Sequence, residues 1–296
     1  MSTKQAPILV GIDFSASSSE VLKQAAHISS VWDSPVIAVH ILDSSALEHW
    51  SARGSSLGSE DELKAQARER LESLASDCEG LKDLQFEVAI GEPAGELAKL
   101  AEEKDAWLLV IAANDRTKDR LGSVASRCVR KVKCDVMIER KWHRGHFEKI
   151  IVCTDLKGNK DPVLERAIKV ASANKATLEI VHVAYPPERD YWGEQYEADR
   201  PAQGLSYAQR VRAETKERLE RCCSTHEEQL SAIKHETRVI ESTHPAIALN
   251  SHIASSGAQL VVLGTRHKGK IAGFFGGTNA ERLMHDVPVS VLAVRV

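Results

Sequence analysis

The sequence contains no CxxC pair, although it has six cysteines. Closely spaced cysteine pairs are typical of zinc sites and of redox-active disulfides, and that spacing is missing here. The six are Cys78, Cys128, Cys134, Cys153, Cys222 and Cys223. We therefore favour unpaired thiols in a reducing cytosol, which predicts a cytoplasmic protein, and we expect no metal site. The adjacent Cys222 and Cys223 leave a redox role open as the alternative.

An excess of positive charge is also missing. The chain carries 39 Lys and Arg against 42 Asp and Glu, for a formal net charge of -3. A general nucleic-acid-binding protein would usually be basic, so this balance argues against one. No apolar run reaches the length of a membrane span, and the first residues lead straight into an expected strand rather than a signal peptide. We expect neither a nucleic-acid partner nor a membrane partner.

What the sequence does contain is a long internal repeat. Residues 8–13 resemble residues 150–155, and residues 36–41 resemble residues 178–183. Three pairs of unlike residues recur at one constant spacing of 142 positions: Asp13 and Asp155, His40 and His182, Trp50 and Trp192. A constant spacing of this kind indicates a duplicated domain. We therefore predict two domains, residues 1–140 and 148–296, joined by a basic linker at 140–146.

Each copy alternates apolar strands with amphipathic helices. The strands expected in the first copy are residues 8–13, 35–42, 84–90, 107–113 and 134–139. Those expected in the second are residues 149–155, 177–184, 234–241, 259–264 and 288–295. Helices fill most of the intervals, and the stretches 43–59 and 185–203 are expected to be long loops. The predicted fold class is α/β: two tandem, doubly wound, Rossmann-like domains, each with a five-stranded, mostly parallel sheet and helices on both faces.

Ligands of such sheets bind beyond the carboxyl ends of the strands, where the strand order reverses. Asp13 and Asp155 end the first strand of each copy, so both are expected at this edge. The loop after strand 259–264 is expected there too, and it holds five glycines within residues 264–277. Glycine backbone and a following helix N-terminus can together hold phosphate. A solvated basic turn is the alternative.

Two familiar nucleotide motifs do not fit this glycine-rich loop. Gly264 to Lys270 matches GxxxxGK, but Ile271 stands where a Walker A loop needs Ser or Thr. The dinucleotide fingerprint GxGxxG would follow the first strand, where Gly11 is the only glycine.

The loop resembles the signature of the universal stress protein family, G-x2-G-x9-G-[ST]. Gly264 matches the first glycine, and Gly277 with Thr278 matches the closing pair. The second glycine is replaced by His267, whose ring could instead donate to a phosphate. The first copy keeps only Gly122 and Ser123 of this pattern, in a loop three residues shorter. The resemblance extends over the whole chain as two tandem domains, with a degenerate nucleotide loop in the first.

This resemblance implies a binding site for an adenine nucleotide, ATP or AMP, with or without Mg²⁺, mainly in the second copy. Asp155 would contact the nucleoside and the backbone of Val183 the adenine. The residues that would hold or adjoin the phosphates are Gly264, Thr265, His267, Gly277, Thr278 and Asn279. The alternative for Asp13 and Asp155 is a helix cap at a strand end.

Other repeated residues allow more than one interpretation. His40 and His182 are expected to be core histidines bonded to a neighbouring loop, with a nucleotide or metal contact as the alternative. The aromatic residues near Trp50 and Trp192 could cover a pocket or pack under a long loop. The final strand of each copy resembles an exposed edge strand. In the family that the chain resembles, single domains dimerise through this strand, which implies an intramolecular pseudo-dimer and leaves a further homodimer open.

The sequence predicts a tandem universal stress protein that regulates a stress response by binding an adenine nucleotide and influencing the choice of protein partners. The alternative is an interaction scaffold that binds a small ligand or a protein without nucleotide. We find no catalytic residues, no general base near the loop and no nucleophile motif, so any ATP hydrolysis is expected to be slow.

Overall fold

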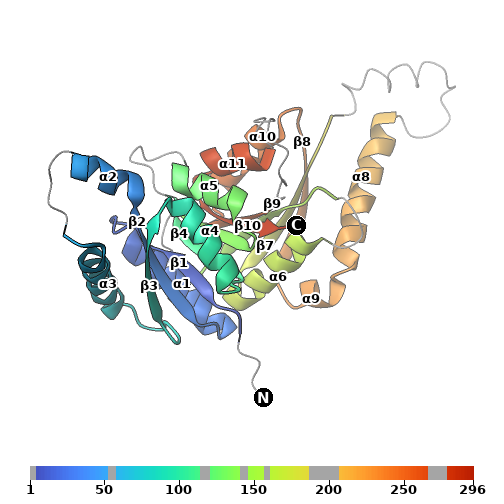
Figure 1. Cartoon of the computed structure of the whole chain (residues 1–296). Coiled ribbons are helices and arrows are strands. Elements are labelled where there is room, and N and C mark those ends of the chain that lie inside the picture. Colours follow the sequence, from blue (N-terminus) through green and yellow to red (C-terminus); the bar gives the residue numbers. More distant parts are fainter. Residues whose placement is uncertain are drawn as a thin grey trace. The chain divides into compact units, whose positions relative to one another are not determined.

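The computed structural model describes residues 5–52, 58–113, 121–140, 146–156, 161–186, 207–265 and 279–296. These residues divide into two compact units. The first contains the residues up to His146 and also the C-terminal segment Pro288–Val296, and the second begins at Phe147. Each unit is described by itself below, with the element labels of Figure 1.

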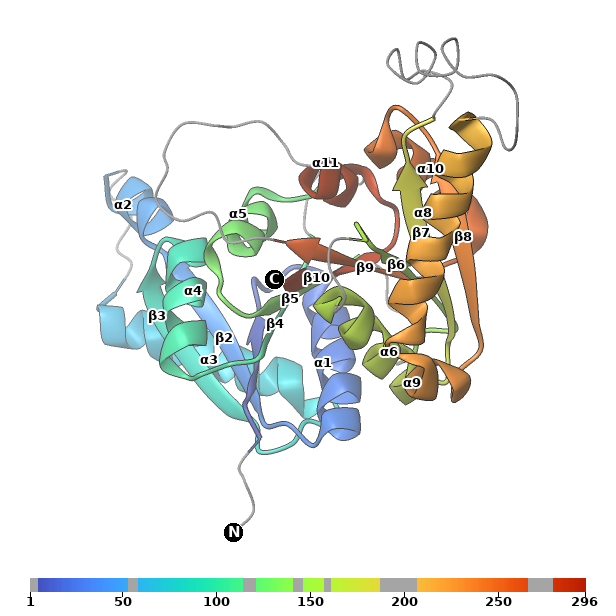
Figure 2. The ribbon, with the colours of Figure 1, turned by 90° about the vertical axis from the view of Figure 1, so that its right-hand side faces the viewer.

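The first unit is built from strands that alternate with helices. Its elements in chain order are β1 (Ile8–Gly11), α1 (Ser18–Trp32), β2 (Val36–Asp43), α2 (Ser44–Ala52), α3 (Glu60–Ser76), β3 (Gln85–Gly91), α4 (Pro93–Glu103), β4 (Leu108–Ala112), α5 (Ser123–Lys131), β5 (Asp135–Glu139) and the final strand β10 (Ser290–Arg295). Helices α1 and α3 contact each other, as do α4 and α5, which lie side by side in Figures 1 and 2. The two pairs cover opposite faces of the sheet, as expected for a doubly wound fold.

The second unit repeats the same alternation. Its elements are β6 (Lys149–Cys153), α6 (Pro162–Asn174), β7 (Thr177–Ala184), α8 (Tyr207–Ser224), α9 (Glu227–Ser231), β8 (His235–Glu241), α10 (Pro245–Ser256), β9 (Leu260–Thr265) and α11 (Asn279–Asp286). Helix α8 contacts β8, whereas α10 contacts α11 and β7. The two copies therefore share one order of elements, as the repeat predicts.

Both units have parallel sheets whose order places the first strand of each copy in the interior. The first runs β3-β2-β1-β4-β5 and the second β9-β6-β7-β8. Within each of these two runs, neighbouring strands are parallel. Strand β10 is the exception, because it pairs antiparallel with β5, with Leu292 opposite Met137. The α/β, mostly parallel and doubly wound fold is thus confirmed, and the end strands of the two copies pair with each other.

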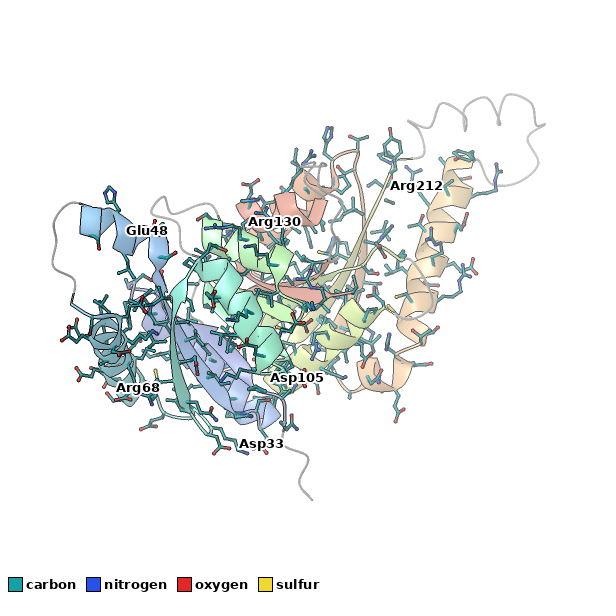
Figure 3. The ribbon with its side chains drawn as sticks, in the orientation of Figure 1. Asp33, Glu48, Arg68, Asp105, Arg130 and Arg212 are labelled. Atoms are coloured by element: carbon teal, nitrogen blue, oxygen red, sulfur yellow. The ribbon has the colours of Figure 1, made fainter. Side chains whose placement is uncertain are left out.

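The cores consist of the apolar runs that the sequence places on these strands. Ile8, Leu9 and Val10 of β1 are fully buried, and so are Ile150 and Ile151 of β6. Strands covered by helices on both faces are expected to be continuously apolar. The charged residues labelled in Figure 3, such as Asp33, Arg68 and Arg130, lie on the outer surfaces of their elements.

Backbone conformation repeats along with the sequence. Phe14 and Leu156, one residue after the paired aspartates, both have left-handed backbone, with φ of 58° and 53°. Asp33 and Lys175, which end α1 and α6, are left-handed as well, with φ of 55° and 53°. Left-handed backbone is uncommon for residues other than glycine, so the same turn has been retained in both copies.

One sequence-based expectation needs correction, and another concerns residues that lie mostly outside the described ranges. The stretch 43–59 was expected to be a loop, but its first part forms helix α2. Asp43 accepts hydrogen bonds from the backbone N–H and the hydroxyl of Ser45, at 2.9 and 2.7 Å, so the serine-rich start supports a helical turn. Most of the second long loop, with Trp192, lies outside the described residues, as does the side chain of Trp50. None of the described helices is both long and apolar enough to cross a bilayer.

Candidate functional site

The first repeated aspartate stabilises the turn that leads into helix α1. Asp13 Oδ1 accepts a hydrogen bond from the backbone N–H of Ser15 at 2.9 Å and from the hydroxyl of Ser18 at 3.2 Å. The N-cap residue of α1 is Ser17, which makes no side-chain cap bond, so Asp13 holds the preceding turn rather than the free N–H groups of the helix.

The second copy assigns this capping role to another residue. Asp161, not Asp155, precedes α6, and its Oδ1 accepts from the backbone N–H groups of Val163 and Leu164 at 2.9 and 3.2 Å. Its Oδ2 accepts the hydroxyl of Thr154 at 2.5 Å. Asp155 is exposed at the end of β6. Asp13 and Asp155 are therefore both exposed beyond the end of a first strand, and the helix cap of the second copy is Asp161.

The paired histidines support the turns beside these aspartates. The Nδ1 of His40 lies 2.7 Å from the carbonyl oxygen of Ile12, and the Nδ1 of His182 lies 2.9 Å from that of Thr154. A carbonyl oxygen only accepts, so Nδ1 carries the proton in both rings. Burial lowers the pKa of His40 from its ordinary value. The expectation of histidines bonded to a neighbouring loop is confirmed.

Helix α8 supports the turn in the second copy. An Nη of Arg218 donates to the carbonyl oxygen of Leu156 at 3.0 Å. In the first copy the related Arg70 lies over the ring of Phe14, 4.4 Å from its centroid, and that ring is 4.3 Å from the ring of His40. A polar contact to the backbone replaces an aromatic stack, so the same turn is held by different chemistry in each copy.

Three predicted site residues lie at one edge of the second sheet. β6 pairs with β7 on one side and with β9 on the other. Asp155 follows β6, Val183 is near the end of β7, and Gly264 is near the end of β9. From β6 the chain proceeds to β7 and β8 and returns to β9 on the opposite side, so the strand order reverses between β6 and β9. Such a switch point is where ligands of open α/β sheets bind.

The remaining predicted residues are only partly described. The hydroxyl of Thr265 donates to the carbonyl oxygen of Val294 at 3.2 Å and is buried, so this side chain already has a structural role. Asn279 is the first residue of α11, and its side-chain surroundings are not described. His267, Gly277 and Thr278 lie outside the described residues.

The turn before helix α4 of the first copy also differs from the turn before helix α10 of the second copy. In the first copy Glu92 caps α4, accepting from the backbone N–H groups of Ala94 and Gly95 at 3.1 and 2.8 Å. Its carboxylate also pairs with Lys131 at 2.8 Å and Arg127 at 2.9 Å. Partial burial pushes the pKa of Glu92 upward, but these partners outweigh it and hold the pKa below its ordinary value. Two cations of α5, Arg127 and Lys131, are thus paired within the protein.

The second copy has no such carboxylate. His244 occupies the corresponding turn and makes no side-chain cap bond to α10. The end of α11 carries Asp286 rather than a lysine.

The second unit contains a buried carboxylate with basic neighbours, which the sequence did not lead us to expect. Glu179 of β7 has a side chain with 0% exposure. It accepts from Arg238 Nε at 2.6 Å and His252 Nε2 at 2.8 Å, and Lys149 Nζ lies 3.0 Å away. Burial pushes the pKa of Glu179 up, but the bonds from Arg238 and Lys149 outweigh burial and lower it. A lone acidic residue in the apolar run of residues 178–183 was the only signal in the sequence.

The cysteines are unpaired and mostly shielded. All six are free thiols. Burial raises the pKa of Cys128 and of Cys153 to about 12, so neither is a reactive thiolate near neutral pH. Burial likewise raises the pKa of Cys223 to about 11 and raises that of Cys222. Within the described ranges, no cluster of histidine, cysteine and carboxylate side chains could hold a metal ion.

Comparison with known proteins agrees with the duplicated architecture. The model of the universal stress protein family matches the chain twice, over residues 6–140 and 146–295. A universal stress protein of Mycolicibacterium smegmatis is 24% identical over 303 residues, covering 97% of this chain and 96% of the relative. One from Methanocaldococcus jannaschii is 32% identical over 139 residues, which is 45% of this chain and 81% of the relative.

Solved structures show the same fold. The structure of a universal stress protein from Archaeoglobus fulgidus is similar over 98% of this chain and 99% of its own, with a TM-score of 0.61 and 18% identity. A second structure, of a putative universal stress protein from Pseudomonas aeruginosa, covers 98% of this chain and 93% of its own, with a TM-score of 0.61 and 16% identity.

Proposed function

The chain belongs to the universal stress protein family as a tandem, two-copy member, and on that premise we propose that its second copy binds an adenine nucleotide, ATP or AMP. The observation that carries this proposal is the position of Asp155 and Gly264 at the carboxyl ends of β6 and β9, where the strand order reverses. Binding would let the protein report nucleotide levels to partners during a stress response.

The glycine-rich loop, of which the first copy keeps only Gly122 and Ser123, supports the choice of the second copy. Asp13 accepts from two groups at the start of α1. In the second copy Asp161 caps the helix, and the exposed Asp155 can accept from the hydroxyls of a ribose. The backbone of Val183 would contact the adenine.

The phosphates would be held by backbone N–H groups of the loop that begins after Gly264. Helix α11 begins at Asn279, so its N-terminus would add donors and the positive end of its dipole. Magnesium, where present, would be held by the phosphates themselves. No general base is assigned, so the protein acts as a binding protein, and hydrolysis is expected to be slow.

A scaffold without nucleotide is the second candidate. The pairing of β10 with β5 favours it, because this contact joins the end strands of the two copies within one chain. One polypeptide would then present what two single-domain chains present as a dimer.

Matched variants in the two copies test the nucleotide proposal. Isothermal titration calorimetry would be carried out with ATP and AMP, and also with cAMP and dAMP, because solved universal stress proteins include complexes with these two. We expect Asp155→Ala to weaken binding about 10- to 100-fold, as for loss of hydrogen bonds to a charged group. Asp13→Ala should leave the affinity within about twofold of the parent, after correction for any loss of folding.

The loop is tested in the same way. Gly277→Val should abolish binding because a branched side chain would block the approach of phosphate to the backbone, and Gly122→Val should not. Equal affinity in the parent and Gly277→Val would refute the site, and binding lost only in the first-copy variants would move it to the other copy.

A further inference from the structure

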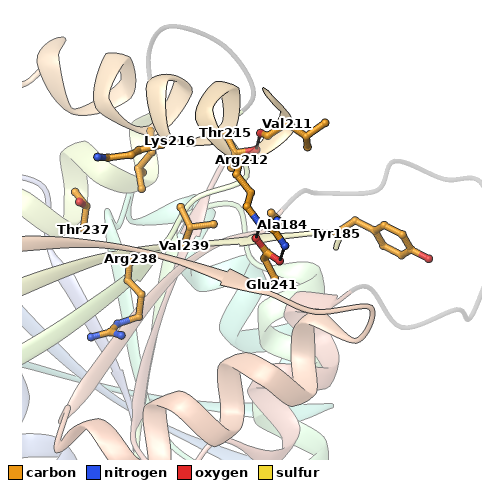
Figure 4. Close-up of a pocket in the computed structure, with 11 residues that line it drawn as sticks. Ala184, Tyr185, Val211, Arg212, Thr215, Lys216, Thr237, Arg238, Val239 and Glu241 are labelled. Atoms are coloured by element: carbon orange, nitrogen blue, oxygen red, sulfur yellow. Dashed lines mark hydrogen bonds and ion pairs between the residues drawn. The ribbon is translucent and has the colours of Figure 1, made fainter. Parts of the chain in front are cut away.

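A cavity lies in the second unit, between helix α8 and the edge strand β8. Its volume is about 300 Å³, at the lower end of the range for small-molecule sites. Figure 4 shows its lining, with Thr215 on the helix and Thr237 and Val239 on the strand. Ala184 of its lining follows Val183 of the proposed nucleotide site, but Asp155, Val183 and Gly264 do not themselves line the cavity.

The corresponding space in the first copy is occupied by larger side chains. The registers make Thr237 equivalent to Phe86, because Ile180 pairs with Thr237 as Ala38 pairs with Phe86. In the first copy Arg68 of α3 lies over the ring of Phe86, 5.9 Å from its centroid. Threonine in place of phenylalanine removes this filling, so the cavity is a feature of the second copy's sequence.

A second exchange acts at the other end of the cavity. Ala184 pairs with Glu241 as Leu42 pairs with Ile90, so an apolar isoleucine has become a glutamate. Arg212 of α8 binds Glu241 through two contacts, Nε to Oε1 at 2.6 Å and Nη2 to Oε2 at 2.9 Å. This bidentate pair joins helix to strand and leaves no net charge at that end.

The middle of the cavity is apolar. Val211 and Leu219 of α8 and Val239 of β8 line it. Leu219 is 3% exposed, whereas Val239 is 36% exposed and is one of the exposed large apolar residues of the described chain. An apolar body of a ligand could cover Val239 and remove that surface from water.

Apart from the Arg212–Glu241 pair, the charged residues that line the cavity are basic. Lys216 follows Arg212 by one helical turn, which is about 6 Å along α8. Val239 precedes Glu241 by two residues, which is about 7 Å along β8, so Lys216 lies opposite Val239. The Lys216 side chain is 76% exposed, and its ammonium lies 3.7 Å from the carboxylate of Glu220, which is itself 63% exposed. Figure 4 shows the ammonium on the Thr237 side, and the Thr237 hydroxyl has no hydrogen-bond partner among the described residues. Arg238 also lines the cavity, but its guanidinium binds Glu179.

We propose that this cavity binds a small monocarboxylate with an apolar body, its carboxylate at Lys216 and Thr237 and its hydrocarbon against Leu219 and Val239. An ammonium and a hydroxyl donor that line the same cavity suit a carboxylate, which accepts at both oxygens. The neutral Arg212–Glu241 pair closes the opposite end, so the apolar body needs no second charge. Ligands with an ammonium head are disfavoured by the net positive lining.

The test uses the full chain and octanoate as the probe, with 1-octanol and octylamine at equal concentration as comparators. Titration calorimetry should show octanoate binding more tightly than either comparator. Thr237→Phe restores the residue of the first copy, fills the cavity and should abolish octanoate binding. Lys216→Met should weaken it about fivefold, as for loss of one exposed ion pair.

Two controls keep the outcome specific. Arg68→Met, at the equivalent position of the first copy, and Asp155→Ala, in the proposed nucleotide site, should both leave octanoate affinity within about twofold of the parent, as expected for distant sites. Circular dichroism would establish that each variant is folded, and Lys216→Met remains informative if Thr237→Phe does not fold. Equal binding of octanoate and octylamine, unchanged binding in a folded Thr237→Phe variant, or no octanoate binding by the parent would each overturn the proposal.

Discussion

Replacing Glu179 with glutamine should destabilise the second unit. The carboxylate sits at 0% exposure and has three cationic or hydrogen-bonding neighbours, on β6, β8 and α10. It therefore connects the edge strand β8 and the helix α10 to the middle of the sheet. The first copy has Ile37 at this position of the repeat, so the cluster belongs to the second copy alone.

The magnitude follows from the contacts. Removing one partner of a buried ion pair costs about 3–5 kcal/mol when the other ion stays buried. Here the side chains of Arg238 and Lys149 are 49% and 27% exposed, so both can turn toward water. Glutamine also retains one oxygen acceptor. We therefore expect a loss of about 2–3 kcal/mol in the free energy of unfolding at pH 7.

The pH dependence has a defined sign. Although burial opposes it, the cationic partners lower the pKa of Glu179 in the folded protein. A carboxyl group with a lowered folded pKa stabilises the protein fully above its unfolded pKa of about 4.3 and loses that contribution as the pH falls through the folded pKa. The difference between parent and Glu179→Gln should thus be present at neutral pH and shrink as the pH falls through the folded pKa of Glu179.

Urea denaturation followed by circular dichroism would measure the difference. Glu236→Gln is the matched control, because Glu236 contacts the same Lys149 at 3.4 Å but is 50% exposed. It should change the free energy of unfolding by less than about 0.5 kcal/mol. A loss below 1 kcal/mol for Glu179→Gln at pH 7, or a difference that grows on acidification, would refute the reasoning.

Three further predictions concern single side chains. Glu92→Ala should cost about 1 kcal/mol in thermal denaturation through loss of the α4 cap, and an unchanged melting temperature would contradict that role. The pKa of His40 measured by NMR should lie below about 6.5, because burial lowers it. The contribution of His40 to stability is then complete above that pH and declines below it, and a higher measured pKa would contradict this. Cys128 is 0% exposed and burial raises its pKa to about 12, so it should remain unmodified by iodoacetamide in the native protein at pH 8. The partly exposed Cys78 should react, and peptide mapping that finds both cysteines equally labelled would contradict the buried position of Cys128.

The fold was predictable because local patterns determine it. Continuous apolar runs such as residues 8–10 and 150–152 must be covered on both faces, and the helical periodicity between them supplies that cover. The constant spacing of Asp13 and Asp155 gave the duplication without any structure. Helix α2 was missed because its serines favour turns as much as helix starts.

The site was predictable only in part. The positions of Asp155 and Gly264 at one sheet edge follow from the alternation of strands and helices. The role of Asp161 as the cap of α6 depends on loop geometry that no periodicity contains. The Glu179 cluster and the cavity beside Thr237 join residues from distant elements, so they become visible only with the strand register.

The central claim is that the second copy binds an adenine nucleotide, and the most direct measurement is the nucleotide content of the protein as purified. The protein would be prepared without added nucleotide, denatured, and the released small molecules identified by mass spectrometry. The account predicts ATP, ADP or AMP near one equivalent per chain, with Asp155→Ala depleted and Asp13→Ala unchanged. A protein that is empty, and that also shows no heat of binding with added ATP or AMP, would contradict it.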